Sequence, residues 1–163
     1  MVFKTVMVSA TLLCSLVAGF LFAFAVVAMP GIGRLNDRSF IRAFQVIDGV
    51  IQDNQPIFMF VWVGSVVALV VAAAIGFSQI DGANRTILIG AVIVYLLGVQ
   101  LPTARINIPL NNRIQALDVD QMSDQQASNA RTEFEGQWNR WNVIRTVVAT
   151  FIALTLYLLL LRM

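Results

Sequence analysis

Residues Ile57–Phe77 read IFMFVWVGSVVALVVAAAIGF, an apolar segment without a single charged side chain. Three segments of the same kind span Val6–Met29, Thr86–Leu101 and Val143–Leu161, and Arg145 is the one charged residue in all four. The hydrocarbon core of a bilayer, about 30 Å thick, is crossed by about 20 mostly apolar helical residues. Lipid offers no partner to unpaired backbone groups, so such segments must be helices. The sequence therefore predicts an all-α membrane protein, a four-transmembrane-helix bundle.

The composition also indicates a chain whose main partner is the lipid bilayer. Of its residues, 58% are hydrophobic and 12% are charged, whereas soluble domains carry about 25% charged residues. The net charge is only +2 and there is no basic tract, which argues against nucleic acid as a partner. The first segment is longer than the apolar region of a signal peptide and is expected to be retained. We therefore expect residues 1–163 to form one integral, multi-pass membrane domain, which in a bacterium would lie in the inner membrane.

Four spans place both termini on one side and the two long connecting segments, Pro30–Pro56 and Pro102–Asn142, on the other. The first connection carries apolar residues at helical spacing after a plausible N-cap at Asn36 or Asp37, which predicts an amphipathic helix. The third span is interrupted by prolines yet stays partly apolar as far as Leu117, so a kinked, extended third helix is expected. In the second connection, Ser123 and Gln126 form a capping-box signature, after which a helix is expected to continue into an extended fourth span.

Small residues recur along the spans, for example every fourth position from Gly64 to Gly76. Such stripes let membrane helices approach closely. They favour packing within one bundle, with a homo-oligomeric interface as the alternative. The positive-inside rule counts three Lys or Arg on the side of the termini and eight on the other, so it places the larger polar face in the cytoplasm.

Several kinds of site are disfavoured by what the sequence lacks. It contains no histidine and one cysteine, Cys14, which leaves almost no ligands for a metal, a haem or an iron–sulfur cluster. No Gly-rich nucleotide loop is present. The spans hold no carboxylate of the kind that proton-coupled transporters use. The sequence therefore predicts neither a cofactor nor a metal, and it argues against a transporter.

Polar residues gather where the third and fourth spans meet the larger polar face. Two segments carry them, and together they supply Arg105, Asn107, Asn111, Trp138, Trp141, Asn142 and Arg145. The last four of these lie at i, i+3, i+4 and i+7, on one stripe of a helix. One interpretation is an interfacial belt or polar contacts between helices, and the other is a site for a hydrophobic ligand. A buried Arg145 would need an anionic partner, and the candidates are Asp48, Asp53 and Glu133.

The chain also resembles the anthrone-oxygenase-like family of small four-span membrane proteins. The resemblance rests on three segments in the same order and spacing: Ala18-Gly19-Phe20 through Ala28-Met29-Pro30, Ile106-Asn107-Ile108-Pro109-Leu110-Asn111, and Trp138 through Trp141-Asn142 with Arg145-Thr146. Family members often have histidine after the Trp-Asn pair, where this chain has Val143. Many members have no assigned activity, while some relatives oxidise anthrones with molecular oxygen and no cofactor.

The resemblance implies a hydrophobic aromatic or quinone-like small molecule as ligand, and it leaves open whether the chain is an enzyme. If the chain is an oxygenase, the resemblance implies that Arg145 or Arg105 pairs with a substrate anion. Hydrogen bonds would come from the asparagines Asn107, Asn111 and Asn142, and Trp138 and Trp141 would stack on the substrate rings. Asp48 or Glu133 would serve as base or counter-ion. An enzyme predicts an enclosed pocket lined by Asn107, Asn111, Trp141 and Arg145. A purely structural role predicts that the same side chains bond to one another without a void.

Overall fold

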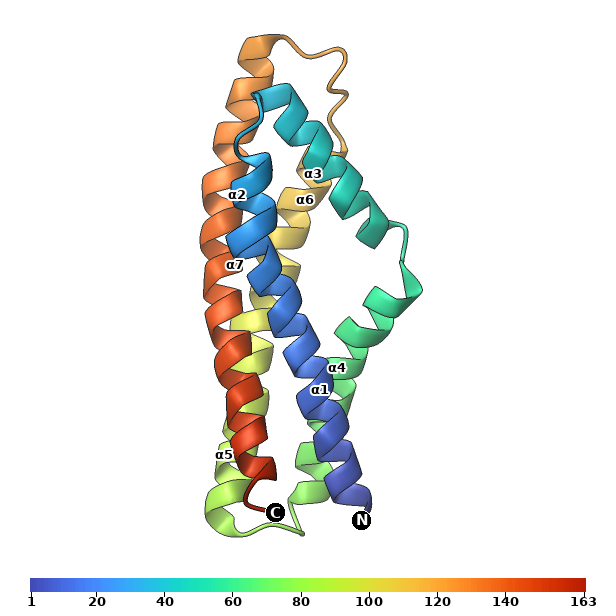
Figure 1. The fold of residues 1–163 in the computed structure, drawn as a ribbon, viewed down its shortest axis with the longest axis vertical. Helices are drawn as coiled ribbons and strands as arrows, with labels where there is room; N and C mark the ends of the chain where they lie inside the picture. Colours follow the sequence, from blue (N-terminus) through green and yellow to red (C-terminus); the bar gives the residue numbers. More distant parts are fainter.

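The computed structural model describes all of residues 1–163, and it is helical almost throughout (Figure 1). The first rod contains α1 (Val2–Ala23), a π-helical turn η1 (Phe24–Ala28) and α2 (Met29–Ile32). Next come α3 (Asp37–Gln52) and α4 (Pro56–Gly76). The third rod contains α5 (Gly82–Tyr95), two π-helical turns η2 (Leu96–Gln100) and η3 (Thr103–Asn107), and α6 (Ile108–Gln115). The last is α7 (Asp124–Leu160).

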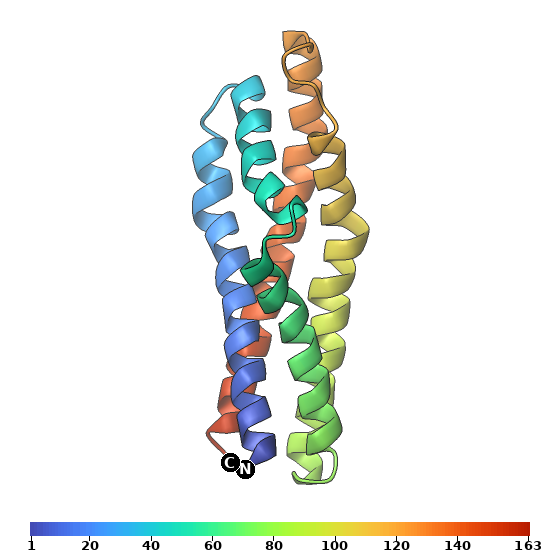
Figure 2. The same ribbon diagram turned by 90° about the vertical axis from the view of Figure 1, so that its right-hand side faces the viewer.

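Four of these helical stretches are long and apolar enough to cross a membrane: Val2–Ile32, Pro56–Gly76, Gly82–Gln115 and Asp124–Leu160. The prediction of an all-α bundle with four membrane helices is therefore confirmed, as are the amphipathic helix in the first connection and the extended third and fourth helices. The chain is an integral, multi-pass membrane protein. Both termini lie at the same end of the bundle (Figures 1 and 2).

The helix ends follow the capping residues of the sequence. Asn36 accepts a hydrogen bond from the backbone N–H of Ser39, so of the two expected caps it is Asn36 that begins α3. Ser123 and Gln126 form the expected capping box at the start of α7. Asn54 adopts φ 57° between α3 and α4, a left-handed conformation that asparagine tolerates and that lets the chain bend there, while both helices run toward the end where the termini lie.

The π-helical turns all stand in the same relation to a proline. Each covers the five residues that end two positions before Pro30, Pro102 or Pro109. Inside a helix, the proline ring collides with the carbonyl four residues earlier, and that carbonyl lies at the centre of each π turn. A wider π turn accommodates the collision without ending the helix. The expected interruption of the third helix is thus a pair of π turns rather than a break.

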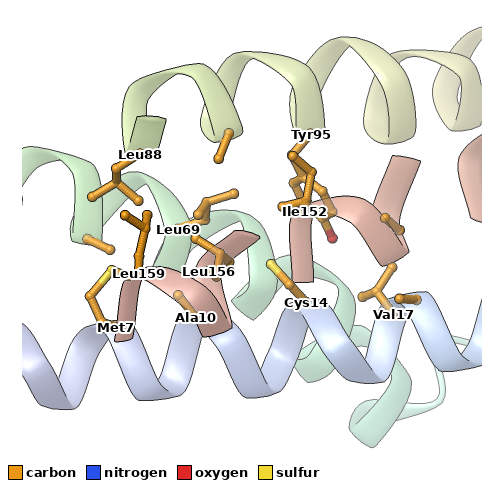
Figure 3. Packing of buried hydrophobic residues seen from close by; sticks show 14 of the residues in the cluster. Met7, Ala10, Cys14, Val17, Leu69, Leu88, Tyr95, Ile152, Leu156 and Leu159 are labelled. Carbon is orange, nitrogen blue, oxygen red and sulfur yellow. The ribbon is translucent and has the colours of Figure 1, made fainter. Parts of the chain in front are cut away.

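Two hydrophobic clusters stabilise the molecule at different levels. The lower one joins all four spans, and Figure 3 shows Tyr95 and Ile152 near Cys14, and Leu69 beside Leu156. The upper one joins α2, α3, α6 and the first half of α7 through Met29, Phe40, Ile41, Phe44, Leu110, Ile114, Val119, Ala127, Phe134 and Trp138. We call this upper part the head. The lower cluster is the core of the membrane bundle.

Close packing in the membrane bundle depends on small residues. A Cβ added at Gly76 would lie 2.9 Å from the Phe3 ring, and one added at Gly98 would lie 2.8 Å from a methyl group of Val148. These glycines therefore let helices of one chain approach each other. A Cβ at Gly19 or Gly90 would meet nothing within 4 Å.

Candidate functional site

A cavity of about 190 Å³ lies between the head and the membrane bundle, beneath the junction of α3 and α4. The first rod, α3, α4, the third rod and α7 all contribute to its lining: Phe20, Leu21, Phe24, Phe44, Asp48, Ile51, Phe58, Met59, Trp62, Thr103, Asn107, Ile108, Asn111, Trp138, Asn142 and Arg145. Figure 2 shows the α3–α4 junction in front of the α7 rod at this level. The cavity lies where the two hydrophobic clusters leave a gap.

Aromatic rings form much of the cavity wall. Phe58 stacks on Trp62 with an interplanar angle of 24° and 5.5 Å between centroids. Phe20 lies 5.1 Å from Phe58 on the α1 side. Phe24 lies 5.7 Å from Trp138. Flat walls of this kind offer stacking surfaces to a planar aromatic ligand.

Asp48 is the carboxylate of the cavity. Its side chain projects from α3, and the residue is 3% exposed. Oδ1 accepts a hydrogen bond of 2.7 Å from Asn111, and Oδ2 accepts hydrogen bonds of 3.1 Å from both Gln52 and Gln115. Because amides rather than a cation hold it, the carboxylate has a fixed position and no paired positive charge.

Trp138 and Asn111 connect that carboxylate to α7. The Trp138 Nε1–H donates a hydrogen bond of 2.7 Å to Asn111 Oδ1, while the amide nitrogen of Asn111 binds Asp48. Trp138 is 4% exposed, and its ring lies 5.6 Å from that of Phe44. It is therefore a buried wall of the cavity and not a headgroup anchor.

Arg145 is buried without an acidic partner. It is 4% exposed, and it donates hydrogen bonds of 2.8 Å to Thr103 Oγ1 and 3.1 Å to Asn142 Oδ1. None of the ion pairs in the structure includes it. At about 1.5 Å per residue, Arg145 lies about 24 Å along the helix from Leu161, within the length of α7 that a hydrocarbon core of about 30 Å would cover if it began there. The expectation that Asp48, Asp53 or Glu133 pairs with this guanidinium is wrong.

The two remaining asparagines bind backbone groups. Asn142 donates a hydrogen bond of 3.1 Å to the Leu21 carbonyl, which joins α7 to α1. Asn107 donates one of 3.5 Å to the Trp138 carbonyl. The Asn107 Oδ1 atom and the Arg145 Nε atom are both buried without a hydrogen-bond partner.

The π-helical turns supply part of this lining. Phe24 belongs to η1, whereas Thr103 and Asn107 are the first and last residues of η3. A π turn shifts the side chains that follow it around the helix, and such turns are frequent at functional sites. The prolines that impose the turns therefore also direct residues toward the cavity.

The structure brings together six of the nine predicted site residues: Asp48, Asn107, Asn111, Trp138, Asn142 and Arg145. The other three lie outside the cavity lining. Arg105 is exposed, Trp141 is half-buried, and Glu133 is exposed beside Arg113 in a smaller pocket. Of the four residues expected to line a pocket, Asn107, Asn111 and Arg145 do so and Trp141 does not.

Sequence reasoning missed Thr103 and most of the aromatic wall. From the sequence, Phe44 belongs to the apolar face of the helix in the first connection, and Phe58 and Trp62 belong to a span, which gives none of them a role in a site. A possible signal was the clustering of aromatic residues near the head-side ends of α1 and α4, since Phe20, Phe24, Phe58 and Trp62 lie within two turns of those ends.

Comparisons with known proteins gave one match. A family model described as anthrone oxygenase matches residues 55–155, which is more than half of the chain and includes α4, the third rod and most of α7. Neither the curated proteins nor the solved structures gave a match.

Proposed function

The chain belongs to the anthrone oxygenase family, and on that premise we propose that its cavity binds a planar aromatic molecule and oxidises it with molecular oxygen without a cofactor. One observation carries the proposal. A cavity with aromatic walls is lined by both a carboxylate, Asp48, and a guanidinium without an anion, Arg145. The alternative of purely structural polar contacts predicted no void here.

The cavity suits the size and shape of such a ligand. An apolar cavity of about 150 Å³ binds benzene in a well-studied case, and this one measures about 190 Å³. This cavity is larger than that one and partly open, so a ligand with more than one ring can extend beyond it. A hydrophobic molecule can reach it from the bilayer, where it would already be dissolved.

The proposed reaction converts a CH₂ group conjugated with an aryl ketone into a second carbonyl, so that R₂CH₂ and O₂ give R₂C=O and H₂O. A base removes one proton from the CH₂ group, and the anion gives one electron to O₂. The radical pair combines to form a C–O bond, and the peroxide takes up the proton to give R₂CH–OOH. Loss of the second hydrogen as a proton, with cleavage of the O–O bond, gives the carbonyl and water.

Three residues of the cavity have separate roles in this reaction. Asp48 is the only carboxylate in the lining, so it accepts the first proton and returns it to the peroxide. Arg145 balances the negative charge that the substrate oxygen gains, in a site from which lipid and aromatic rings exclude water. Asn111 holds Asp48 in place through the hydrogen bond of 2.7 Å.

An oxygen-uptake assay with anthrone and purified protein in lipid nanodiscs tests the proposal. We expect consumption of one O₂ per anthraquinone formed, above the rate of protein-free nanodiscs. General acid–base groups contribute about 10²–10⁴-fold to rates, so Asp48→Asn should lower turnover at least about 100-fold. Asp53→Asn, at the exposed end of the same helix, is the control and should keep full activity. Equal turnover in wild type and Asp48→Asn would contradict the proposed base.

A non-catalytic role in binding a hydrophobic ligand requires the same cavity. It differs in one outcome of the assay. Anthraquinone-like molecules would then bind to the protein, and other planar aromatic molecules would displace them. Anthrone, however, would be oxidised no faster than in protein-free nanodiscs.

A further inference from the structure

The cavity reaches the outer surface of the protein beside Ile108. Of the sixteen residues that line the cavity, Ile108 is the only exposed one, with 45% of its surface accessible. Ile51 of α3 and Phe58 and Met59 of α4 also line the cavity and are half-buried. A side chain that faces both a cavity and the outside marks the mouth of that cavity. The mouth therefore lies on the side where the third rod faces α3 and α4.

Two hydrogen bonds join the third rod to α3 and α4, one on each side of Ile108. Toward the head, Gln52 Nε2 donates a hydrogen bond of 3.0 Å to Asn112 Oδ1. Toward the membrane bundle, Trp62 Nε1–H donates one of 3.0 Å to Gln100 Oε1. Gln100 and Asn112 are about 18 Å apart along the rod. Figures 1 and 2 show α4 near the third rod at its lower end and farther from it toward the α3–α4 junction. We call the opening between these two bonds the window.

The window lies where the apolar surface of the spans meets the polar surface of the head. Its two sides belong to stretches that are able to cross a membrane, Pro56–Gly76 and Gly82–Gln115. Next to its lower bond in sequence, the exposed side chains are apolar: Phe60 of α4 and Leu101 of the third rod. Next to its upper bond, Asp53 is exposed and charged. The lower part of the window is therefore surrounded by a surface suited to lipid.

The length of the third rod gives the same level. At about 1.5 Å per residue, Gln100 lies about 27 Å along the rod from Gly82. A hydrocarbon core of about 30 Å that began at Gly82 would end just above Gln100. Arg105 is exposed there, where the stem of an arginine can lie on apolar surface while its guanidinium reaches the headgroups. With that placement, the window opens at the boundary between the hydrocarbon core and the headgroups.

We propose that a planar aromatic molecule enters and leaves the cavity sideways from the head-side leaflet of the bilayer, through the window and between Met59 and Ile108. The inference rests on the ligand class of the proposed function and adds the route. Aromatic groups with one polar atom collect at the boundary of the hydrocarbon core, so an aryl ketone is concentrated where the window opens. Met59 has three rotatable bonds and can turn aside, whereas the β-branched Ile108 is stiff and forms the fixed edge.

Labelling of a cysteine inside the cavity tests the route. Leu21 lines the cavity from the first rod and is 1% exposed, so a reagent reaches the thiol of Leu21→Cys only after it has entered. The reagent is N-phenylmaleimide, a small planar aromatic molecule that dissolves in lipid, and the mass of the intact protein from nanodiscs gives the rate. A sulfonated maleimide, which stays in water, is the comparison. Wild type, in which the one cysteine Cys14 is buried in the lower cluster, gives the background.

We expect N-phenylmaleimide to label Leu21→Cys at least about tenfold faster than the sulfonated reagent does, because a charged group is costly to bring into an apolar opening. Adding Ile108→Trp or Met59→Trp should slow the N-phenylmaleimide reaction about tenfold, which corresponds to about 1.4 kcal/mol in the barrier to entry. Leu101→Trp is the matched control. Leu101 is exposed on the same rod but lies outside the cavity lining, so its replacement should leave the rate unchanged.

Unchanged rates in both Ile108→Trp and Met59→Trp would overturn the proposal, because the reagent would then enter elsewhere. An unchanged rate in one of them would remove that residue from the route. Faster labelling by the sulfonated reagent would place the mouth in water, and no labelling by either reagent would mean that the cavity does not admit aromatic molecules; each contradicts the proposal. None of these results depends on oxygen uptake, so the proposed oxidation can fail while the route holds, and the reverse.

Discussion

Replacing Arg145 by Met removes a buried charge while keeping a long, apolar side chain, and its effect on stability distinguishes a ligand site from polar contacts that join helices. The variant loses hydrogen bonds to Thr103 and Asn142, each worth about 1.5–3 kcal/mol for a charged donor. The variant no longer has to keep an unpaired guanidinium out of water. That desolvation costs several kcal/mol, and membrane-insertion scales give about 3 kcal/mol for an Arg at the centre of a helix. We therefore expect the free energy of unfolding to change by less than about 2 kcal/mol.

The same substitution at Arg131, about four turns away on α7, is the matched control. Arg131 forms ion pairs of 3.1 Å with Asp37 and 2.7 Å with Glu135, and it also donates to the carbonyls of Gly33 and Leu35. The hydrogen bond to Glu135 is the main reason why the pKa of Arg131 is raised above its ordinary value. Arg131→Met leaves these acceptors without a donor and should cost about 2–4 kcal/mol.

Unfolding is followed by tryptophan fluorescence during denaturant titration in nanodiscs, and oxygen uptake with anthrone is measured on the same samples. For Arg145→Met we expect near wild-type stability with loss of oxygen uptake. A loss of about 3–5 kcal/mol, as for a broken buried ion pair, would refute the reasoning, because it would make the guanidinium a structural contact between helices.

Two further predictions concern packing and the cavity wall. Gly98→Ala places a Cβ 2.8 Å from Val148 and should lower the free energy of unfolding by about 1–3 kcal/mol. In Gly90→Ala the added Cβ meets no atom within 4 Å, so the free energy of unfolding should stay unchanged. Equal effects of Gly98→Ala and Gly90→Ala in the same denaturant titration would contradict the close packing of Gly98 on Val148. Trp138→Phe removes the donor to Asn111 and should cost about 1–3 kcal/mol together with at least part of the oxygen uptake, and wild-type values for both would show that this hydrogen bond is dispensable.

Much of the fold could be predicted from the sequence because hydrophobic length and capping residues act locally. The spans follow from uncharged apolar segments, and Ser123 and Gln126 indicated the start of α7. The outcome at Pro102 and Pro109 was harder to predict, because a proline can end, kink or widen a helix, and its neighbours in the bundle decide among these. The π turns end two positions before three of the four prolines, whereas Pro56 begins α4, so a proline alone does not determine which outcome applies.

The site was only partly predictable for a different reason. Helical spacing put Trp138, Trp141, Asn142 and Arg145 on one stripe, but the width of the cavity decides which of them reach it, and Trp141 at the edge does not. The lack of an acid beside Arg145 could not be predicted, because Asp48 lies on another helix and is held by amides instead. Partner choice across helices depends on distances that periodicity does not contain.

The position of a bound ligand gives the most direct test of the cavity as a binding site. A crystal soaked with a bromine-labelled anthraquinone, measured at the bromine absorption edge, should show one anomalous peak between the rings of Phe58 and Trp138, beneath the α3–α4 junction. A peak elsewhere, such as in the shallow groove between α1 and α7 beside Gly19 and Tyr157, with none in the cavity, would contradict it.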